Sequence, residues 1–396
     1  MPSSDVVRPT DRGAALVLAC MLGGSAGWAM TAAGAGAATI APAYDAGLVT
    51  VGLMTTALAA PYAALQLPAG ALVDRIGPRK ASVLGLTLVV VVHVLAATVP
   101  LTWLALVCRA AAGAGYAVCF VSGAELVRRS GAGASALGIF GGVSLAASGL
   151  SVLVIPLAEG MLGWRAAWVT SGAAALVAVT LVALVPVPAM AVRSPGRPDR
   201  EDRPAATGWI LLDGELHRLA AVHAVTLGLG VVLSNWAAVL LVTDWGFSRP
   251  AAALAASLVL GLTVLSRPLG GALALRLPHH RGRVSALSLL ACALATLALA
   301  APTVPAVAVV AVVTLGVLGG LPFAAVLAAG QARRPDRPAA AVGLLNSQAN
   351  GLILLGTPLL GAAIEGAWSS PALVLLAVLW LVPLLVWPRS YRRLGV

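Results

Sequence analysis

Long apolar runs alternate with short polar segments along almost the whole chain. Each run has about the twenty residues that a helix needs to cross a hydrocarbon core of about 30 Å. Twelve runs can be counted, and they predict an all-α membrane protein with twelve transmembrane helices. The predicted spans are Gly13–Ala38, Leu48–Val73, Ala81–Val99, Leu101–Ala124, Ser135–Ala158, Ala166–Val187, Leu216–Val242, Ala251–Leu273, Val284–Ala301, Val304–Gly330, Ala341–Ile364 and Ala372–Trp387.

The basic residues indicate how the spans are oriented. Arg109 and Arg267 fall well inside spans and Arg218 at the start of span seven; the other basic residues cluster in alternate loops, and the opposite loops hold only Arg165 and Arg249. Basic loops remain on the cytoplasmic side of a membrane. An even number of spans with this bias predicts a multi-pass protein of the cell membrane with both termini cytoplasmic.

A polar segment divides the chain into two halves. Residues 188–215 are rich in Pro, Arg, Asp and Glu and predict a cytoplasmic linker between six-helix bundles at 1–187 and 216–396. The halves repeat each other weakly, since Gly70 and Arg75 around the end of span two have the same spacing as Gly271 and Arg276 around the end of span eight. Such pseudo-repeats around a central cavity are typical of alternating-access transporters.

Composition narrows the function further. Hydrophobic residues make up 60% of the 396 residues and charged ones only 10%, which excludes a soluble domain and a nucleic-acid partner in spite of the net charge of +11. We find no nucleophile–base arrangement, phosphate loop or metal-ligand cluster, so the sequence predicts neither an enzyme nor a cofactor. The four cysteines lie in apolar runs without metal-ligand spacing.

Three motifs resemble those of one membrane family. The segment Gly70-Ala-Leu-Val-Asp74-Arg75-Ile-Gly77-Pro-Arg79-Lys80 resembles the loop 2–3 signature of the major facilitator superfamily, and Arg109 with Gly113 and Gly115 resembles its span-four signature. The turn Gly163-Trp-Arg is similar to one common in these proteins. The resemblance covers essentially the whole chain and implies two six-helix bundles around a central cavity.

The resemblance also implies a gate at the cytoplasmic side. The aspartate of this motif is associated in the family with locking that side shut, which implies the role for Asp74. A carboxylate is stabilised at a helix N-terminus, and Pro338 is well placed to begin span eleven. The residues expected to belong to the gate are Gly70, Asp74, Arg75, Gly77, Arg79, Lys80 and Glu125, with Arg75 and Glu125 as a partner pair.

Two arginines inside spans are the strongest candidates for binding a solute. An arginine within a span is costly, so Arg109 should face the cavity, a substrate or a structural partner. The sequence around Arg267 resembles the nitrate/nitrite branch of the superfamily, in which arginines of spans two and eight clamp the anion. Gln66 occupies the span-two position here, which puts nitrate itself in doubt but leaves another anion open.

Polar residues elsewhere in the spans are further candidates for lining a cavity, and hydrogen bonds between helices are an equally good account of them. Asn346 and Asn350 are four residues apart and should share one face of span eleven. The candidates besides the two arginines are Trp28, Tyr62, Gln66, Tyr116, Asn235, Asn346 and Asn350.

The sequence therefore favours a secondary transporter of a small anionic or polar neutral solute that works by alternating access. A drug-type exporter of lipophilic compounds is the alternative, although no Asp or Glu lies at mid-span to attract a cation. A non-transporting membrane sensor on the same fold is a second alternative. We expect a monomer in a lipid bilayer, and the sequence leaves a coupling proton or counter-solute open.

Overall fold

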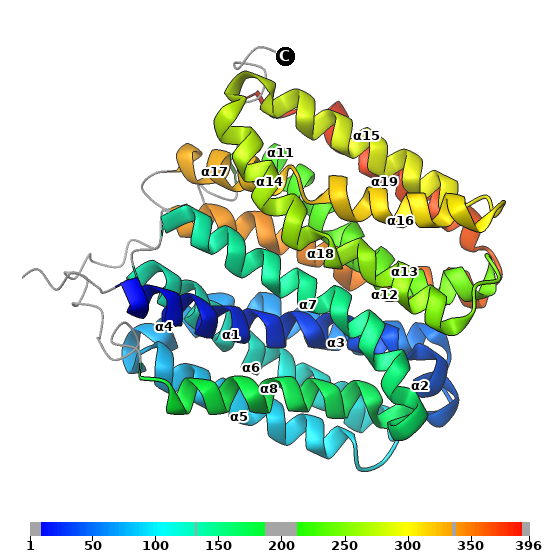
Figure 1. The fold of residues 1–396 in the computed structure, drawn as a ribbon, viewed down its shortest axis with the longest axis horizontal. Coiled ribbons are helices and arrows are strands. Elements are labelled where there is room, and N and C mark those ends of the chain that lie inside the picture. The colour runs from blue at the N-terminus through cyan, green and yellow to red at the C-terminus, as the bar shows by residue number, and fades with distance from the viewer. Residues whose placement is uncertain (1–8, 131–132, 187–211, 335–337, 390–396) are drawn as a thin grey trace, which may run out of the picture.

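The computed structural model describes residues 9–130, 133–186, 212–334 and 338–389. Helices of the first half lie together in one bundle and those of the second half in another beside it (Figure 1). The helices of the first half are α1 (Pro9–Ala35), α2 (Ala37–Ala43), α3 (Leu48–Ala64), α4 (Gln66–Ile76), α5 (Pro78–Ala96), α6 (Thr102–Arg129), α7 (Gly133–Leu162), the 3-10 turn η1 (Gly163–Arg165) and α8 (Ala166–Leu184).

The second half is interrupted more often. It contains a π-helical segment, η2, in the middle of its first span, and a 3-10 turn, η3, between its second and third spans. Its elements are α11 (Gly214–His223), η2 (Ala224–Leu229), α12 (Gly230–Thr243), α13 (Arg249–Gly261), α14 (Thr263–Arg276), η3 (Pro278–His280), α15 (Arg281–Leu299), α16 (Pro305–Gly319), α17 (Phe323–Arg333), α18 (Pro338–Glu365) and α19 (Ser369–Leu385).

The all-α prediction is confirmed, and all twelve predicted spans fall on helices. Within the described residues, nine stretches are long and apolar enough to cross a membrane, or ten if the bent pair α2 and α3 forms one span. One stretch, Gly138–Leu184, holds both α7 and α8, and the 17-residue α19 is a shorter apolar helix. The count of twelve is consistent with these helices. Most of the predicted linker lies outside the described residues.

Helix α5 shows how these helices meet lipid. Leu84, Leu88 and Val91, spaced by four and three residues, are 60%, 40% and 57% exposed, while Val89 and His93 on the other face are buried. A stripe of exposed aliphatic side chains along a helix would be unfavourable in water and suits a hydrocarbon surface. The structure thus places α5 between the interior of its bundle and the bilayer.

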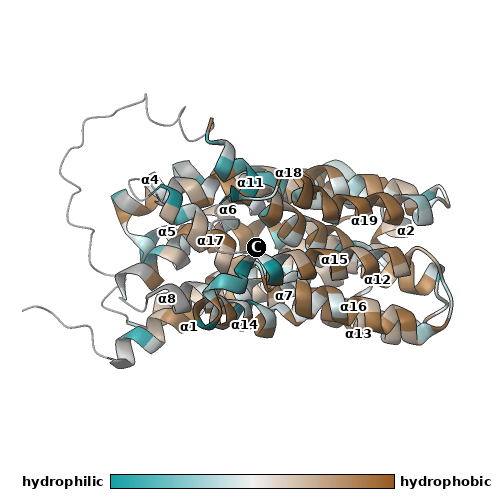
Figure 2. Ribbon diagram, turned by 90° about the horizontal axis from the view of Figure 1, so that it is seen from above, coloured by the Kyte–Doolittle hydropathy of each residue, from teal (hydrophilic) through white to brown (hydrophobic). Residues whose placement is uncertain are grey.

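Hydrophilic positions collect at the ends of the helices. In Figure 2, brown hydrophobic positions run along the helices, and teal positions gather mainly at the end that carries α4 and the starts of α1 and α11. We call this the basic end, because it holds Arg12, Arg75, Arg281 and Arg333. The opposite end carries α2, η1 and the turn before α16.

Three predicted spans are broken rather than continuous. Span two breaks at Leu65, where Pro68 removes a backbone donor and its ring crowds the carbonyl of the residue four positions earlier. Span eight breaks at Leu262, and span ten breaks at Gly320–Pro322. The broken spans eight and ten also touch, because a Cβ added to Gly270 would lie 2.1 Å from the carbonyl oxygen of Leu321.

The two bundles pack closely on each other along several helices. Helix α3 packs on α18, and α7 packs on α13 and α14. A Cβ on Gly149 of α7 would lie 2.3 Å from the Gly261 nitrogen of α13, so the backbones touch there. Toward the basic end, a Cβ on Gly70, Gly138 or Gly343 would meet nothing within 4 Å. These three glycines thus make no close contact with a neighbouring helix.

Candidate solute site

A small pocket lies inside the second bundle, close to the first. It has room for about one water molecule in this arrangement of the helices. Its lining includes Thr226, Thr263, Arg267, Phe323 and Trp380 from the second bundle and Leu145 from α7 of the first. The pocket is therefore built by the second bundle, and one wall is shared with its neighbour.

Arg267 provides the positive charge of this pocket. Its side chain is 7% exposed, and its guanidinium carbon lies 3.7 Å from the centre of the Phe323 ring, a cation–π contact. Its Nη1 donates a hydrogen bond of 3.3 Å to the carbonyl oxygen of Gly141 on α7. Its Nε is buried without a hydrogen-bond partner. In the described part of the chain, no carboxylate forms an ion pair with Arg267, so its charge is not neutralised.

Irregular backbone surrounds this charge. Thr226 belongs to the π-helical η2, and Phe323 begins α17 directly after the break at Gly320–Pro322. π-Helical turns and broken spans at mid-membrane depth occur where backbone lines a cavity or site. Arg267 itself follows five residues after the break at Leu262. Three interrupted spans thus meet at one buried guanidinium.

A second polar group lies beside the same phenylalanine. The His223 ring is fully buried, and its centre lies 5.8 Å from that of Phe323. Its Nε2 is 2.9 Å from the side-chain oxygen of Asn346, while its Nδ1 has no partner. The Asn350 amide donates to the backbone carbonyl of Asn346 at 2.9 Å. The predicted asparagine face of span eleven therefore meets span seven through Asn346.

Arg109 occupies the interior of the first bundle instead of the pocket. It is 1% exposed, and it donates from Nε to the Met54 carbonyl at 2.9 Å and from Nη1 to the Ala29 carbonyl at 2.8 Å. Its Nη2 has no partner. These bonds join α6 to α1 and α3. Gly113, one turn further, allows α3 to approach, since a Cβ there would lie 2.1 Å from the Leu58 carbonyl oxygen.

The remaining substrate-binding candidates are spread over both bundles. Trp28 donates from Nε1 to the Thr170 hydroxyl at 3.1 Å, and the buried Tyr116 lies against the His93 ring at 6.2 Å. Asn235 accepts a hydrogen bond of 3.2 Å from Thr55, across the two bundles. These contacts are between helices and lie outside the pocket.

Two further candidates lie together at the bend of span two. The half-buried Tyr62 lies edge-on to Phe120 with ring centres 5.9 Å apart, and the half-buried Gln66 follows one turn later. Neither residue contributes to the pocket around Arg267. The predicted pairing of Gln66 with Arg267 as repeat partners thus brings no shared site in this arrangement.

The expected gate residues lie at the basic end, between α4 and α5. Gly77 has φ +83°, the left-handed value that its predicted tight turn requires. Arg79 donates to the Ala183 carbonyl at the end of α8, and Arg75 and Lys80 are exposed. The Asp74 side chain lies outside the described residues.

The other two gate candidates are in different surroundings. Glu125 is half-buried on α6, where it has a polar contact. Gly70 on α4 faces open space, so the close helix approach expected there is not made in this arrangement. α18 does begin at Pro338, as predicted.

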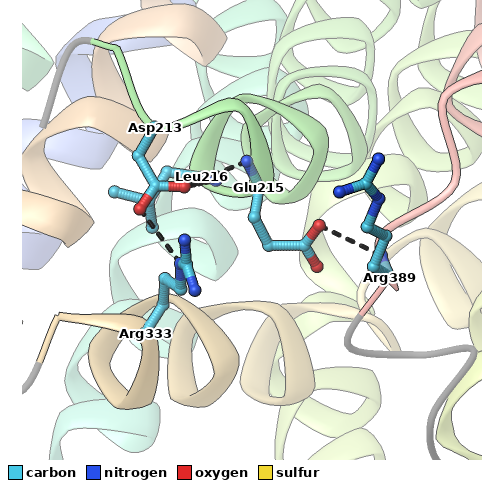
Figure 3. A network of polar contacts seen from close by, with 5 residues as sticks. All are labelled: Asp213, Glu215, Leu216, Arg333 and Arg389. Atoms are coloured by element: carbon cyan, nitrogen blue, oxygen red, sulfur yellow. Dashed lines mark hydrogen bonds and ion pairs between the residues drawn. The ribbon is translucent and has the colours of Figure 1, made fainter.

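A polar network ties three helix ends of the second bundle together at the basic end (Figure 3). Asp213 caps α11, accepting from the backbone nitrogens of Glu215 at 3.0 Å and Leu216 at 3.3 Å, and forms an ion pair of 3.0 Å with Arg333 of α17. Glu215 accepts from the Arg389 backbone nitrogen, beyond α19, at 3.1 Å. Burial alone would raise the pKa of Asp213, but these hydrogen bonds and the Arg333 charge outweigh it and hold the pKa below its usual value of 3.8.

Sequence reasoning missed several parts of the site. The Gly319-Gly320-Leu321-Pro322 run could have indicated the break in span ten, and with it the position of Phe323. The π-helical η2 has no comparable sequence signal, because its residues are mostly apolar or small, like those in the rest of the span. The pairing of His223 with Asn346 depends on the relative rotation of two helices, which periodicity does not give.

Fold and site together define a helical membrane protein of two bundles with a buried charge between interrupted spans. Residues 17–357 match the Major Facilitator Superfamily, and the chain belongs to this family of secondary membrane transporters. No curated protein sequence is significantly similar to the chain.

Solved structures show the same fold. A crystal structure of a point mutant of the nucleoside transporter NupG has a TM-score of 0.74 at 12% identity, covering 97% of this chain and 99% of that one. Another NupG crystal structure has a TM-score of 0.69 at 14% identity, covering 97% and 98%. At this identity the likeness concerns the fold alone.

Proposed function

We propose that this transporter carries a small anionic solute, or a polar neutral one, and that Arg267 is its main contact. The observation that carries the proposal is a buried guanidinium whose charge no described carboxylate balances and whose Nε has no partner. A buried charge without a counter-charge is costly. An anion that enters the pocket would supply that counter-charge through charge-assisted hydrogen bonds.

Arg109 is the second candidate contact. Its Nη2 is also unpartnered, but its two bonds to backbone carbonyls support a structural role in this arrangement of the helices. Seven other residues remain proposed as lining the solute path in other conformations of the transport cycle: Trp28, Tyr62, Gln66, Tyr116, Asn235, Asn346 and Asn350. Of these, Asn346 is supported best, because it contacts His223, whose ring lies against Phe323 of the pocket lining.

We infer that the solute moves by alternating access. Two halves that pack on each other through α3 with α18 and α7 with α13 support this mechanism. The positive-inside rule supports a cytoplasmic basic end, hence cytoplasmic termini and a cell-membrane location.

The proposed gate consists of seven residues of the first half: Gly70, Asp74, Arg75, Gly77, Arg79, Lys80 and Glu125. We propose a monomer as the working unit.

A thermal-stability screen of the purified protein tests the anion site. The probes are nitrate, formate, lactate and benzoate, with glycerol as a neutral polar compound and tetraphenylphosphonium as a lipophilic cation. A compound at 100 times its dissociation constant stabilises by about 2.7 kcal/mol. We expect stabilisation by at least one anion, and Arg267→Gln should weaken its binding about tenfold or more, which is about 1.4 kcal/mol.

Arg276→Gln is the matched control, since it removes an exposed arginine from the same helix. This variant should bind the anion like the wild type. Equal anion binding by the wild type and Arg267→Gln would remove the proposed contact.

A lipophilic solute is the second candidate. The observation in its favour is the largely apolar pocket lining, which includes Leu145 and Trp380. Stabilisation by tetraphenylphosphonium alone, equal in the wild type and Arg267→Gln, would make an exporter of lipophilic compounds the better reading.

A further inference from the structure

His223 is a buried titratable group with an unused nitrogen. Its Nε2 lies against the Asn346 side-chain oxygen, so Nε2 is the nitrogen that carries the hydrogen in the neutral ring. Its Nδ1 then presents a lone pair, and this atom is buried without a partner. A proton that reached the ring would add at Nδ1.

The ring lies close to the charge of the pocket. Phe323 contacts both groups, with its ring centre 3.7 Å from the Arg267 guanidinium carbon and 5.8 Å from the His223 ring centre. Phe323 therefore brings the two groups to the same part of the second bundle. In a medium of low dielectric constant, a positive charge so near opposes a second one.

The elements around His223 carry few other titratable groups. On its own helix, Glu215, His217 and Arg218 lie five or more residues before His223, which is the last residue. Among the packed elements, η2, α12 and α19 contain no titratable residue. Helix α17 has only Arg333 at its far end, α18 only Glu365 at its far end, and α14 has Arg267 and, nine residues on, Arg276. Among the described residues, Arg267 is thus the charged group that shares a contact partner, Phe323, with His223.

An anion in the pocket would reverse this balance. Once Arg267 is neutralised by an anion, its opposition to a proton on His223 disappears, and the protonated ring attracts the anion in turn. Such coupling is reciprocal, because each ligand must raise the affinity for the other by the same factor.

We propose that His223 takes up a proton at Nδ1 when an anion binds at Arg267, so that the protein carries the two together as a proton–anion symporter. The inference rests on the proposed anion site. One N–H bond forms at Nδ1 with a proton from water, and the same bond breaks when the proton leaves with the anion. His223, Phe323 and Arg267 form the coupling unit, and Asn346 fixes the ring.

The test is isothermal titration of the full-length protein in detergent with formate, lactate and benzoate. Each titration is run at pH 7 in MOPS and in Tris, whose different heats of ionisation give the number of protons taken up per anion. We expect close to one proton per anion in the wild type. The dissociation constant should rise as the pH rises, by up to tenfold per pH unit.

His223→Gln should bind the same anion without proton uptake and with a dissociation constant that does not change with pH. His93→Gln is the matched control, because His93 is also buried and also has an unpartnered ring nitrogen, but lies in the first bundle. It should take up protons like the wild type. Asn346→Asp keeps His223 in place and gives it a permanent counter-charge, so the ring is already protonated before the anion binds and proton uptake should disappear.

The outcomes separate the two proposals. Anion binding by the wild type without proton uptake would overturn the coupling and leave the anion site standing. Proton uptake that persists in His223→Gln would place the proton elsewhere. If His223→Gln does not fold, Asn346→Asp decides, and unchanged proton uptake in that variant overturns the inference. If formate, lactate and benzoate all fail to bind to the wild type, the coupling and the anion site fall together, and only the polar neutral solute of the proposed function is left.

Discussion

A guanidinium inside a helical bundle needs acceptors for its N–H groups, and the two buried arginines find them differently. Arg109 uses backbone carbonyls of two neighbouring helices, so its charge is dispersed over dipoles within one bundle. Arg267 uses one carbonyl of the other bundle and the face of an aromatic ring. The bond across the bundles must break or shift whenever they move relative to each other, whereas the bonds of Arg109 can persist.

Gly113 is expected to be the most sensitive small residue beside Arg109. A Cβ there would lie 2.1 Å from a backbone oxygen of α3, which cannot rotate away. Gly113→Ala should therefore cost about 1–3 kcal/mol, like other overpacking substitutions. Thermal unfolding of the purified protein measures the effect.

The control for that substitution is Gly160→Ala on α7, where a Cβ meets nothing within 4 Å. It should be neutral or stabilise the helix by up to about 1 kcal/mol, since alanine is the better helix former. Equal melting temperatures for the two variants would show that α3 and α6 do not touch as described.

Among the elements, the start of α11 offers a pH-dependent contact. Asp213 caps this helix and pairs with Arg333 as a carboxylate, and its pKa in the folded protein lies below 3.8. A depressed pKa means that the stabilisation is complete above the unfolded value and is lost as the pH falls through the folded one. The contact should therefore be intact at neutral pH and weaken only below about pH 4.

Asp213→Ala removes both the cap and the ion pair and should cost about 1 kcal/mol at pH 7. Asp213→Asn keeps a good capping residue and loses only the ion pair, which is half-exposed on the arginine side, so it should cost less. Melting temperatures measured from pH 7 to pH 3 should converge for the wild type and Asp213→Asn at the acid end. A constant difference over that range would contradict the assignment.

How much of an element could be predicted depended on what the sequence encodes locally. The length of the apolar runs predicted the spans. Gly77 predicted a tight turn and Pro338 the start of a helix, because both features follow from local backbone chemistry. Arg267 stood out as a charge in an apolar run. Phe323, His223 and Asn346 did not come together as a site, because their meeting depends on how three helices are rotated and broken, which only packing determines.

At the scale of the whole molecule, the gate motif remains a prediction. If Asp74 helps to hold the basic end shut by meeting the start of α18, removing its charge forfeits up to about 2 kcal/mol in the closed state. Asp74→Asn should then lower uptake by proteoliposomes about tenfold or more while membrane insertion is unchanged. The measurement uses labelled lactate or benzoate, whichever stabilises the purified protein.

Asp45→Asn is the matched control for this variant. Asp45 lies at the opposite end with φ +46°, a left-handed conformation that asparagine tolerates well. Uptake by this variant should equal that of the wild type. Wild-type uptake by Asp74→Asn would remove the gate assignment.

The uncompensated charge of Arg267 has an electrical consequence. An empty pocket is positively charged, whereas a pocket that holds one anion is neutral, and a proton taken up with the anion restores one positive charge. One elementary charge that crosses the full membrane potential changes the energy by about 2.3 kcal/mol per 100 mV. A membrane voltage would therefore act equally on the empty pocket and on the pocket that holds both the anion and the proton, because each carries one positive charge. It would not act on the pocket that holds the anion alone, because that pocket is neutral.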